Sequence, residues 1–96
     1  MSLPKFKKID KALEERIKEV IKTVALSVDG VSSLPQKCVT IDRIQDGLEL
    51  NVSVLVKYGS RIPVVAWDTQ EKIMKSVSDI TETKIKKVNV NIQGVE

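Results

Sequence analysis

Residues 48–58 read LELNVSVLVKY, with an apolar side chain at every second position and Leu55 as an extra apolar residue on the other face. This period of two is typical of a β-strand with one buried face and one solvated face. A slip of one residue would bury Glu49 and Lys57, so the register is well specified. The inward face is predicted to consist of Leu48, Leu50, Val52, Val54, Val56 and Tyr58.

The segment after this strand is predicted to turn and then form a helix. Gly59 permits a turn that a residue with a Cβ would resist, and Pro63 suits the first turn of a helix, where its missing N–H is not needed. Apolar residues at three- and four-residue steps define the buried face of that helix. The main stripe contains Ile62, Ala66, Thr69, Ile73, Val77 and Ile80, and a second, thinner stripe contains Val64, Trp67 and Met74.

A first helix is predicted over residues 10–28. Asp10 is its expected N-cap, Gly30 is its expected stop, and charged residues of both signs cover its outer face. This mixture is typical of a solubilising surface. The buried stripe is predicted to contain Ile9, Leu13, Ile17, Val20, Ile21, Val24 and Val28.

Two more strands are predicted on either side of the central one. Residues 37–44 alternate, with Val39 and Ile41 on one face and Cys38, Thr40 and Asp42 on the other, after a loop at residues 32–35. The Asp46-Gly47 pair is typical of a hairpin turn that leads into the central strand. Residues 87–95 are predicted to form the last strand, with Val88, Val90 and Ile92 on its buried face and Asn89, Asn91 and Gln93 on the other face.

These elements predict one α+β domain over residues 9–96, preceded by a basic N-terminal arm at residues 1–8. The order is helix, strand, strand, helix, strand, because the two periodicities alternate in that way. The simplest assembly is a three-stranded sheet with both helices packed on one face. The strand that follows the second helix runs parallel to the strand before it. The pattern does not decide whether this last strand pairs with the first or the second strand.

Composition excludes several classes of function. The 96 residues contain no histidine and one cysteine, with a formal net charge of +3. Imidazole chemistry, structural zinc and internal disulfides are therefore excluded, and no phosphate-binding glycine motif occurs. No apolar run is long enough to span a bilayer, and residues 1–10 lack the apolar segment of a secretory signal. We therefore expect a cytoplasmic, non-enzymatic protein with no catalytic residue, cofactor or metal.

Two features suggest chemistry, a group of carboxylates and the single cysteine, but each is explained better by its structural role. Asp42, Asp46 and Glu49 lie around the predicted hairpin and could suggest a metal site or an acid/base pair. We attribute them instead to the residue preferences of the turn and to the solvent-exposed face of the strands. Cys38 is expected to be a half-buried small hydrophobic residue rather than a reactive thiol.

The surface predicts an interaction module. Trp67, with Val64 and Met74, is either an aromatic anchor for a partner or a tryptophan that closes the edge of the core. A three-stranded sheet also has two edges that can accept another strand. The solvated sheet face offers hydrogen-bonding side chains at Asn51, Ser53, Asn89, Asn91 and Gln93.

Weak nucleic-acid binding is the alternative hypothesis. It would use the N-terminal lysines together with Lys84, Lys86 and Lys87. The sequence has no GXXG loop and only three aromatic residues, so the platforms of common RNA-binding domains are missing. Nucleic acid is therefore an unlikely partner.

Four collinear segments resemble the alkaline shock protein family of Gram-positive envelope stress-response proteins. They are VDGV at 28–31, VKYG at 56–59, IPVVA at 62–66 and VNVNIQGV at 88–95. The chain departs from the family in its lysine-rich arm and in residues 81–83, where TET replaces the Thr-Gly-Leu that is common there. This second departure concerns a local turn and leaves the fold unchanged.

The resemblance implies a non-enzymatic protein with a role in cell-envelope homeostasis. It implies self-association into a homo-oligomer, and a position at the inner side of the membrane through a protein partner, a membrane-anchored family member. It supplies no catalytic residues.

Overall fold

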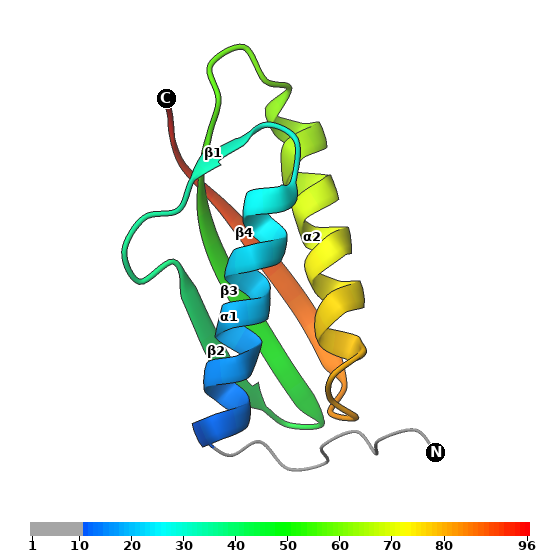
Figure 1. Ribbon diagram of the computed structural model, residues 1–96. Coiled ribbons are helices and arrows are strands. Elements are labelled where there is room, and N and C mark those ends of the chain that lie inside the picture. The colour runs from blue at the N-terminus through cyan, green and yellow to red at the C-terminus, as the bar shows by residue number, and fades with distance from the viewer. Residues whose placement is uncertain (1–10) are drawn as a thin grey trace.

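The computed structural model of the chain describes residues 11–96, which form two helices over one face of a four-stranded sheet (Figure 1). The helices are α1 (Lys11–Ser27) and α2 (Ile62–Ser78). The strands are β1 (Val31–Ser33), β2 (Val39–Ile44), β3 (Gly47–Val56) and β4 (Ile85–Val95). The predicted α+β class is confirmed. The predicted N-terminal arm and the N-cap Asp10 lie outside the described residues.

β3 is the central strand of the sheet. It pairs antiparallel with β1 and β2, and parallel with β4. Because β4 runs along one edge of β3 from Leu48 to Val56, β1 and β2 share the other edge. The predicted parallel relation of the last two strands is confirmed, and the neighbour of β4 is β3.

The sheet has one strand more than predicted. Residues 32–35 were expected to form a loop, but Ser32 and Ser33 belong to β1, where Val31 lies opposite Val56. The physical reason is the length of β3. β2 pairs only as far as Val52, and β1 pairs with Leu55 and Val56 at the far end of β3, where backbone groups still need partners.

Alternation along β3 divides the sheet into a buried face and an open face. Leu48, Leu50, Val52, Val54 and Val56 are almost fully buried, as predicted. The prediction for Tyr58 is wrong, since its side chain is 89% exposed. β3 ends at Val56 and the chain turns at Tyr58 and Gly59, so the alternation does not continue.

Both helices pack their apolar faces on this surface. α1 buries Leu13, Ile17, Ile21 and Ala25, and Val28 beyond its end joins the core. As predicted, α2 buries Thr69, Ile73 and Val77, but at its start it buries Val65 rather than Ile62 and Ala66. Gly30 leaves room for the Val65 side chain, because a Cβ at Gly30 would lie 2.5 Å from Cγ2 of Val65. The buried Thr69 hydroxyl donates to the Val65 carbonyl at 2.7 Å.

Cys38 is also more buried than predicted. Its side chain is 4% exposed and lies in the core, next to buried Val39. The strand alternation does not reach Cys38, because β2 begins at Val39 and Lys37 takes a left-handed conformation with φ of 53°.

The predicted hairpin joins β2 to β3, and its glycine has an additional role. Ile44 pairs with Gly47, so Gln45 and Asp46 form the loop, and Asp46 takes the positive φ of 69°. A Cβ at Gly47 would lie 2.4 Å from the backbone carbonyl oxygen of Lys84. Gly47 therefore permits the close approach of the segment that leads into β4.

We expect Gly47→Ala to destabilise the protein by about 2–3 kcal/mol, because the added methyl group meets rigid backbone. Gly94→Ala is the matched control. A Cβ there would meet only the end of the Leu55 side chain, at 3.2 Å. Urea unfolding measures both variants, and equal losses of stability would contradict the close-approach role of Gly47.

Glu96 connects the end of β4 to β1. Its carboxylate oxygen Oε1 accepts hydrogen bonds from Ser32 Oγ at 2.6 Å and Ser33 Oγ at 2.7 Å. These bonds stabilise the charged form, and they hold the pKa of Glu96 below its ordinary value.

Replacing Ser32 and Ser33 together by alanine is expected to raise the pKa of Glu96 toward that of an unfolded glutamate. In the wild type, the contribution of Glu96 to stability is present above the unfolded pKa and is lost as the pH falls through the lower folded pKa. An NMR titration of the Glu96 carboxyl group measures the shift. An unchanged pKa in the double variant would show that the serines do not stabilise the carboxylate.

Candidate interaction surface

β4 forms one complete edge of the sheet. Within residues 11–96 it pairs only with β3, so the outer side of its backbone has no strand partner. Residues 88–95 contain neither proline nor a charged side chain. Proteins usually protect long edge strands with such residues, and their absence leaves the middle of β4 open to another strand.

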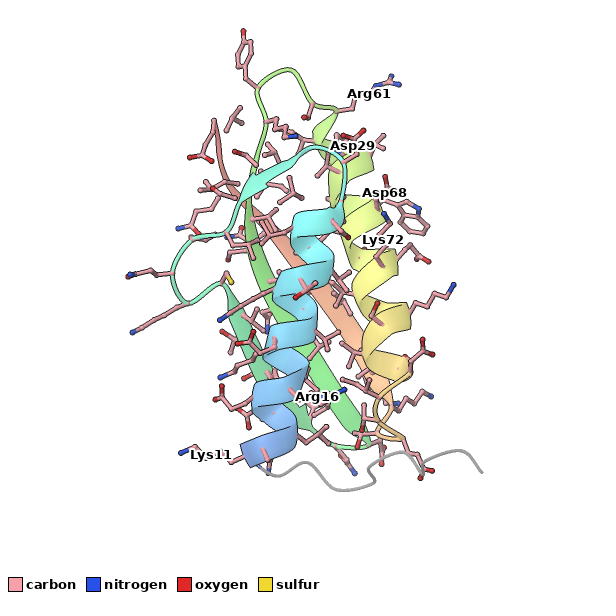
Figure 2. The ribbon with its side chains drawn as sticks, viewed as in Figure 1. Lys11, Arg16, Asp29, Arg61, Asp68 and Lys72 are labelled. Carbon is pink, nitrogen blue, oxygen red and sulfur yellow. The ribbon has the colours of Figure 1, made fainter. Side chains whose placement is uncertain are left out.

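Helix α2 covers β4 and also packs against α1. At about 100° per residue, Met74 and Trp67 lie roughly 100–120° from buried Ile73 in one direction around the helix, and Asp68 lies about 140° in the other. Asp68 and Asp29 line a common hollow beside the end of α1. Figure 2 shows Asp29, Arg61 and Asp68 at this end of the helix pair.

Trp67 and Met74 therefore lie on the flank of α2 that faces away from α1. The Trp67 side chain is 59% exposed, whereas Met74 packs partly against the core. Val64, which is 49% exposed, borders the hollow near Asp29. The three residues of the predicted second stripe thus differ in their surroundings, with Val64 at the hollow, Trp67 exposed and Met74 partly packed on the core.

The other predicted interaction residues lie on the open face of β4. The Asn89 amide nitrogen Nδ2 donates to Glu49 Oε1 at 2.8 Å and to Asn51 Oδ1 at 2.9 Å. Asn91 Nδ2 donates to Ser53 Oγ at 3.4 Å. Gln93 is exposed at the irregular register beside Gly94. The open face of β4 thus carries a row of amides, and α2, which covers the other face of β4, exposes Trp67.

The carboxylates near the hairpin belong to the same hydrogen-bonded face. Asp42 and Glu49 lie opposite each other on β2 and β3, where like charges repel. Asp42 Oδ2 accepts a hydrogen bond from Asn51 Nδ2 at 3.1 Å, and the Asn89 amide donates to Glu49. Among residues 11–96, no group of three or more potential ligands could hold a metal ion.

The lysines of the alternative hypothesis are only partly described. Lys84, Lys86 and Lys87 are exposed at the start of β4. The N-terminal lysines lie outside the described residues, so a joint basic surface stays a prediction.

Sequence reasoning identified the side chains of this surface but could not assemble them. Residues 64–74 and 89–93 are separated by a connector, and the pattern left the neighbour of the last strand open. Val90 and Ile92, which are half-buried against the core, also belong to this edge and were assigned only to the buried face. The alternation signal could have placed them at an edge only if the strand order had been known.

Two bacterial proteins of uncharacterised function are similar to the chain. YqhY of Bacillus subtilis (strain 168) is 33% identical over 60 residues, which cover 62% of this chain and 44% of YqhY. Spy1535 of Streptococcus pyogenes serotype M6 is 28% identical over 98 aligned positions, covering 86% of this chain and 76% of Spy1535. The matched region is thus less than half of YqhY.

The fold is also found in a solved structure. A doubly substituted variant of the MamM CTD superposes with a TM-score of 0.62 at 15% identity, covering 88% of this chain and 96% of that chain. At this identity the likeness concerns the fold alone.

Neither helix in the described part of the chain has the length and apolar character needed to cross a membrane.

The sequence profile of the alkaline shock protein family, a family with a cell envelope-related function, matches residues 32–96 of this chain. This match covers β2, β3, α2 and β4, and it confirms the resemblance drawn from the sequence segments. The chain belongs to the alkaline shock protein family.

Proposed function

We propose that this protein is a non-catalytic interaction module that self-associates through the β4 edge. The proposal rests on two observations: the outer edge of β4 pairs with no strand within residues 11–96, and Trp67 is exposed on α2, the helix that covers β4. Backbone groups of an edge strand supply affinity, and a neighbouring aromatic side chain supplies a specific anchor.

A second copy of the chain is a suitable occupant of this edge. Two β4 strands related by a two-fold axis pair antiparallel, and each presents the same surface to the other. This arrangement places the lysine-rich starts of the two strands at opposite ends of the seam, which is the line where the two β4 strands pair. Like charges are therefore kept apart. The amide row at Asn89, Asn91 and Gln93 then meets its own copy, and these side chains both donate and accept hydrogen bonds.

The biological setting of this module is the cell envelope. The family description supports an envelope-related role. We propose that the protein acts at the cytoplasmic side of the membrane through a membrane-anchored protein partner, as the family resemblance implies. Self-association would present several copies of the domain to that partner and raise the overall affinity.

Trp67→Ala is expected to weaken self-association about tenfold or more, because exposed aromatic anchors contribute much of the binding free energy at interfaces. Multi-angle light scattering over a range of concentrations measures the change. Leu26→Ala is the matched control, since Leu26 is 53% exposed on α1, away from β4. A wild-type chain that stays monomeric at every concentration contradicts the proposal.

Asn91→Lys tests the strand edge itself. A lysine in the middle of an edge strand opposes the addition of another strand, so the oligomer should dissociate at higher concentration than in the wild type. Gln36→Lys adds the same charge in an exposed loop and should leave association unchanged. If both lysine variants weaken association equally, net charge rather than the β4 edge controls it.

A further inference from the structure

A cleft of about 520 Å³ lies between α1 and the edge strand β2, at the opposite edge of the sheet from β4. Its floor is formed by Cys38, Val39 and Ile41, of which Ile41 is only half-buried. The proposed self-association does not use this cleft. β3 lies between it and the seam at β4, because β2 and β4 pair with opposite edges of that strand.

The rim of the cleft is cationic. Lys18 and Lys22 project from α1, and Lys37 precedes the floor residues. Among residues 11–96, neither Lys22 nor Lys37 has a carboxylate at ion-pair distance. Both are therefore available to an anionic partner.

Carboxylates at the cleft offset only part of this charge. Glu14 is held between Lys18 Nζ and Arg43 Nη2, each at 3.7 Å, and Glu15 is exposed at the rim. Three lysines and Arg43 against two glutamates leave a local net charge of +2. The cleft therefore attracts negative charge while its floor offers apolar contact.

The backbone of β2 adds directional binding groups to the cleft. The N–H of Ser53 donates to the Cys38 carbonyl at 2.8 Å, which fixes the alternation of the antiparallel ladder. Thr40 and Asp42 consequently direct their backbone groups toward β3. The N–H and C=O groups of Val39, Ile41 and Arg43 point outward, where no strand within residues 11–96 pairs with them.

We propose that the α1–β2 cleft binds an extended acidic peptide segment of a partner protein, which adds to β2 as a further strand. Side chains of the added strand that point toward the helices would enter the cleft. An apolar side chain there would pack on Val39 and Ile41, and acidic side chains on either side of it would meet Lys22 and Lys37. Its other side chains would lie near Asp42, so acidic residues are disfavoured on that face.

This combination favours an extended peptide over other anions. A nucleic acid or a lipid headgroup supplies negative charge, but neither offers alternating N–H and C=O groups to the β2 edge. A helical peptide keeps its own backbone groups paired and gains nothing from that edge.

The test uses a labelled synthetic peptide, acetyl-TETITET-amide, titrated with the full chain and followed by fluorescence anisotropy at low and moderate salt. We expect saturable binding that weakens with added salt. The lysine analogue TKTITKT should not bind. A peptide methylated at alternate backbone nitrogens on its pairing edge should bind about tenfold or more weakly, because it cannot complete the strand ladder.

Charge variants of the protein locate the site. Lys22→Glu with Lys37→Glu should weaken binding about tenfold or more, and Glu15→Gln should strengthen it. Lys72→Glu with Lys75→Glu makes the same charge change on exposed positions of α2 and should leave binding unchanged. Thermal melts confirm that each variant is folded.

Three results would overturn the proposal. These are no binding of the acidic peptide at low salt, equal weakening by the α1–β2 and α2 charge variants, and unchanged binding of the backbone-methylated peptide. The Trp67→Ala chain should still bind the peptide, so failure at this cleft and failure of self-association are measured separately.

Discussion

The structure depends on the burial of one face of β3. Leu48, Leu50, Val52, Val54 and Val56 are nearly inaccessible to solvent, and both helices pack over them. Full burial of each such side chain contributes about 1.5–3 kcal/mol through the removal of apolar surface from water. Because the side chains alternate, the register of β3 cannot shift by one residue without exposing all of them. Every neighbouring strand takes its position from this register.

A central strand with both sides paired leaves two outer edges. β4 covers one side of β3, and β1 and β2 divide the other. The described part of the chain has two helices, and both lie on the buried face of the sheet (Figure 1). On the open face, polar side chains form a chain of hydrogen bonds from Asp42 through Asn51 and Asn89 to Glu49. The two outer edges of the described sheet differ in character, since the helix over β4 exposes Trp67 and the cleft beside β2 is cationic.

Local patterns predicted the elements well where one residue type dominates one face. The alternation of β3, the proline at the start of α2 and the Asp46 turn all follow from preferences of the chain over a few residues. The errors occur where a distant contact decides the conformation. β1 forms because the end of β3 needs a partner, and α2 buries Val65 because Gly30, more than thirty residues earlier, leaves room for it.

The candidate surfaces show the same division. The sequence by itself determined which side chains are available: Trp67 and Met74 on a helix, amides on a strand, and charged residues on the outer face of the first helix. It also determined that β3 has one buried face, because period-two alternation is a local property. Only the tertiary structure decided that α2 lies above β4 and that Lys22 and Lys37 border the same cleft. Such proximity depends on strand order, which is fixed by contacts between segments far apart in the chain.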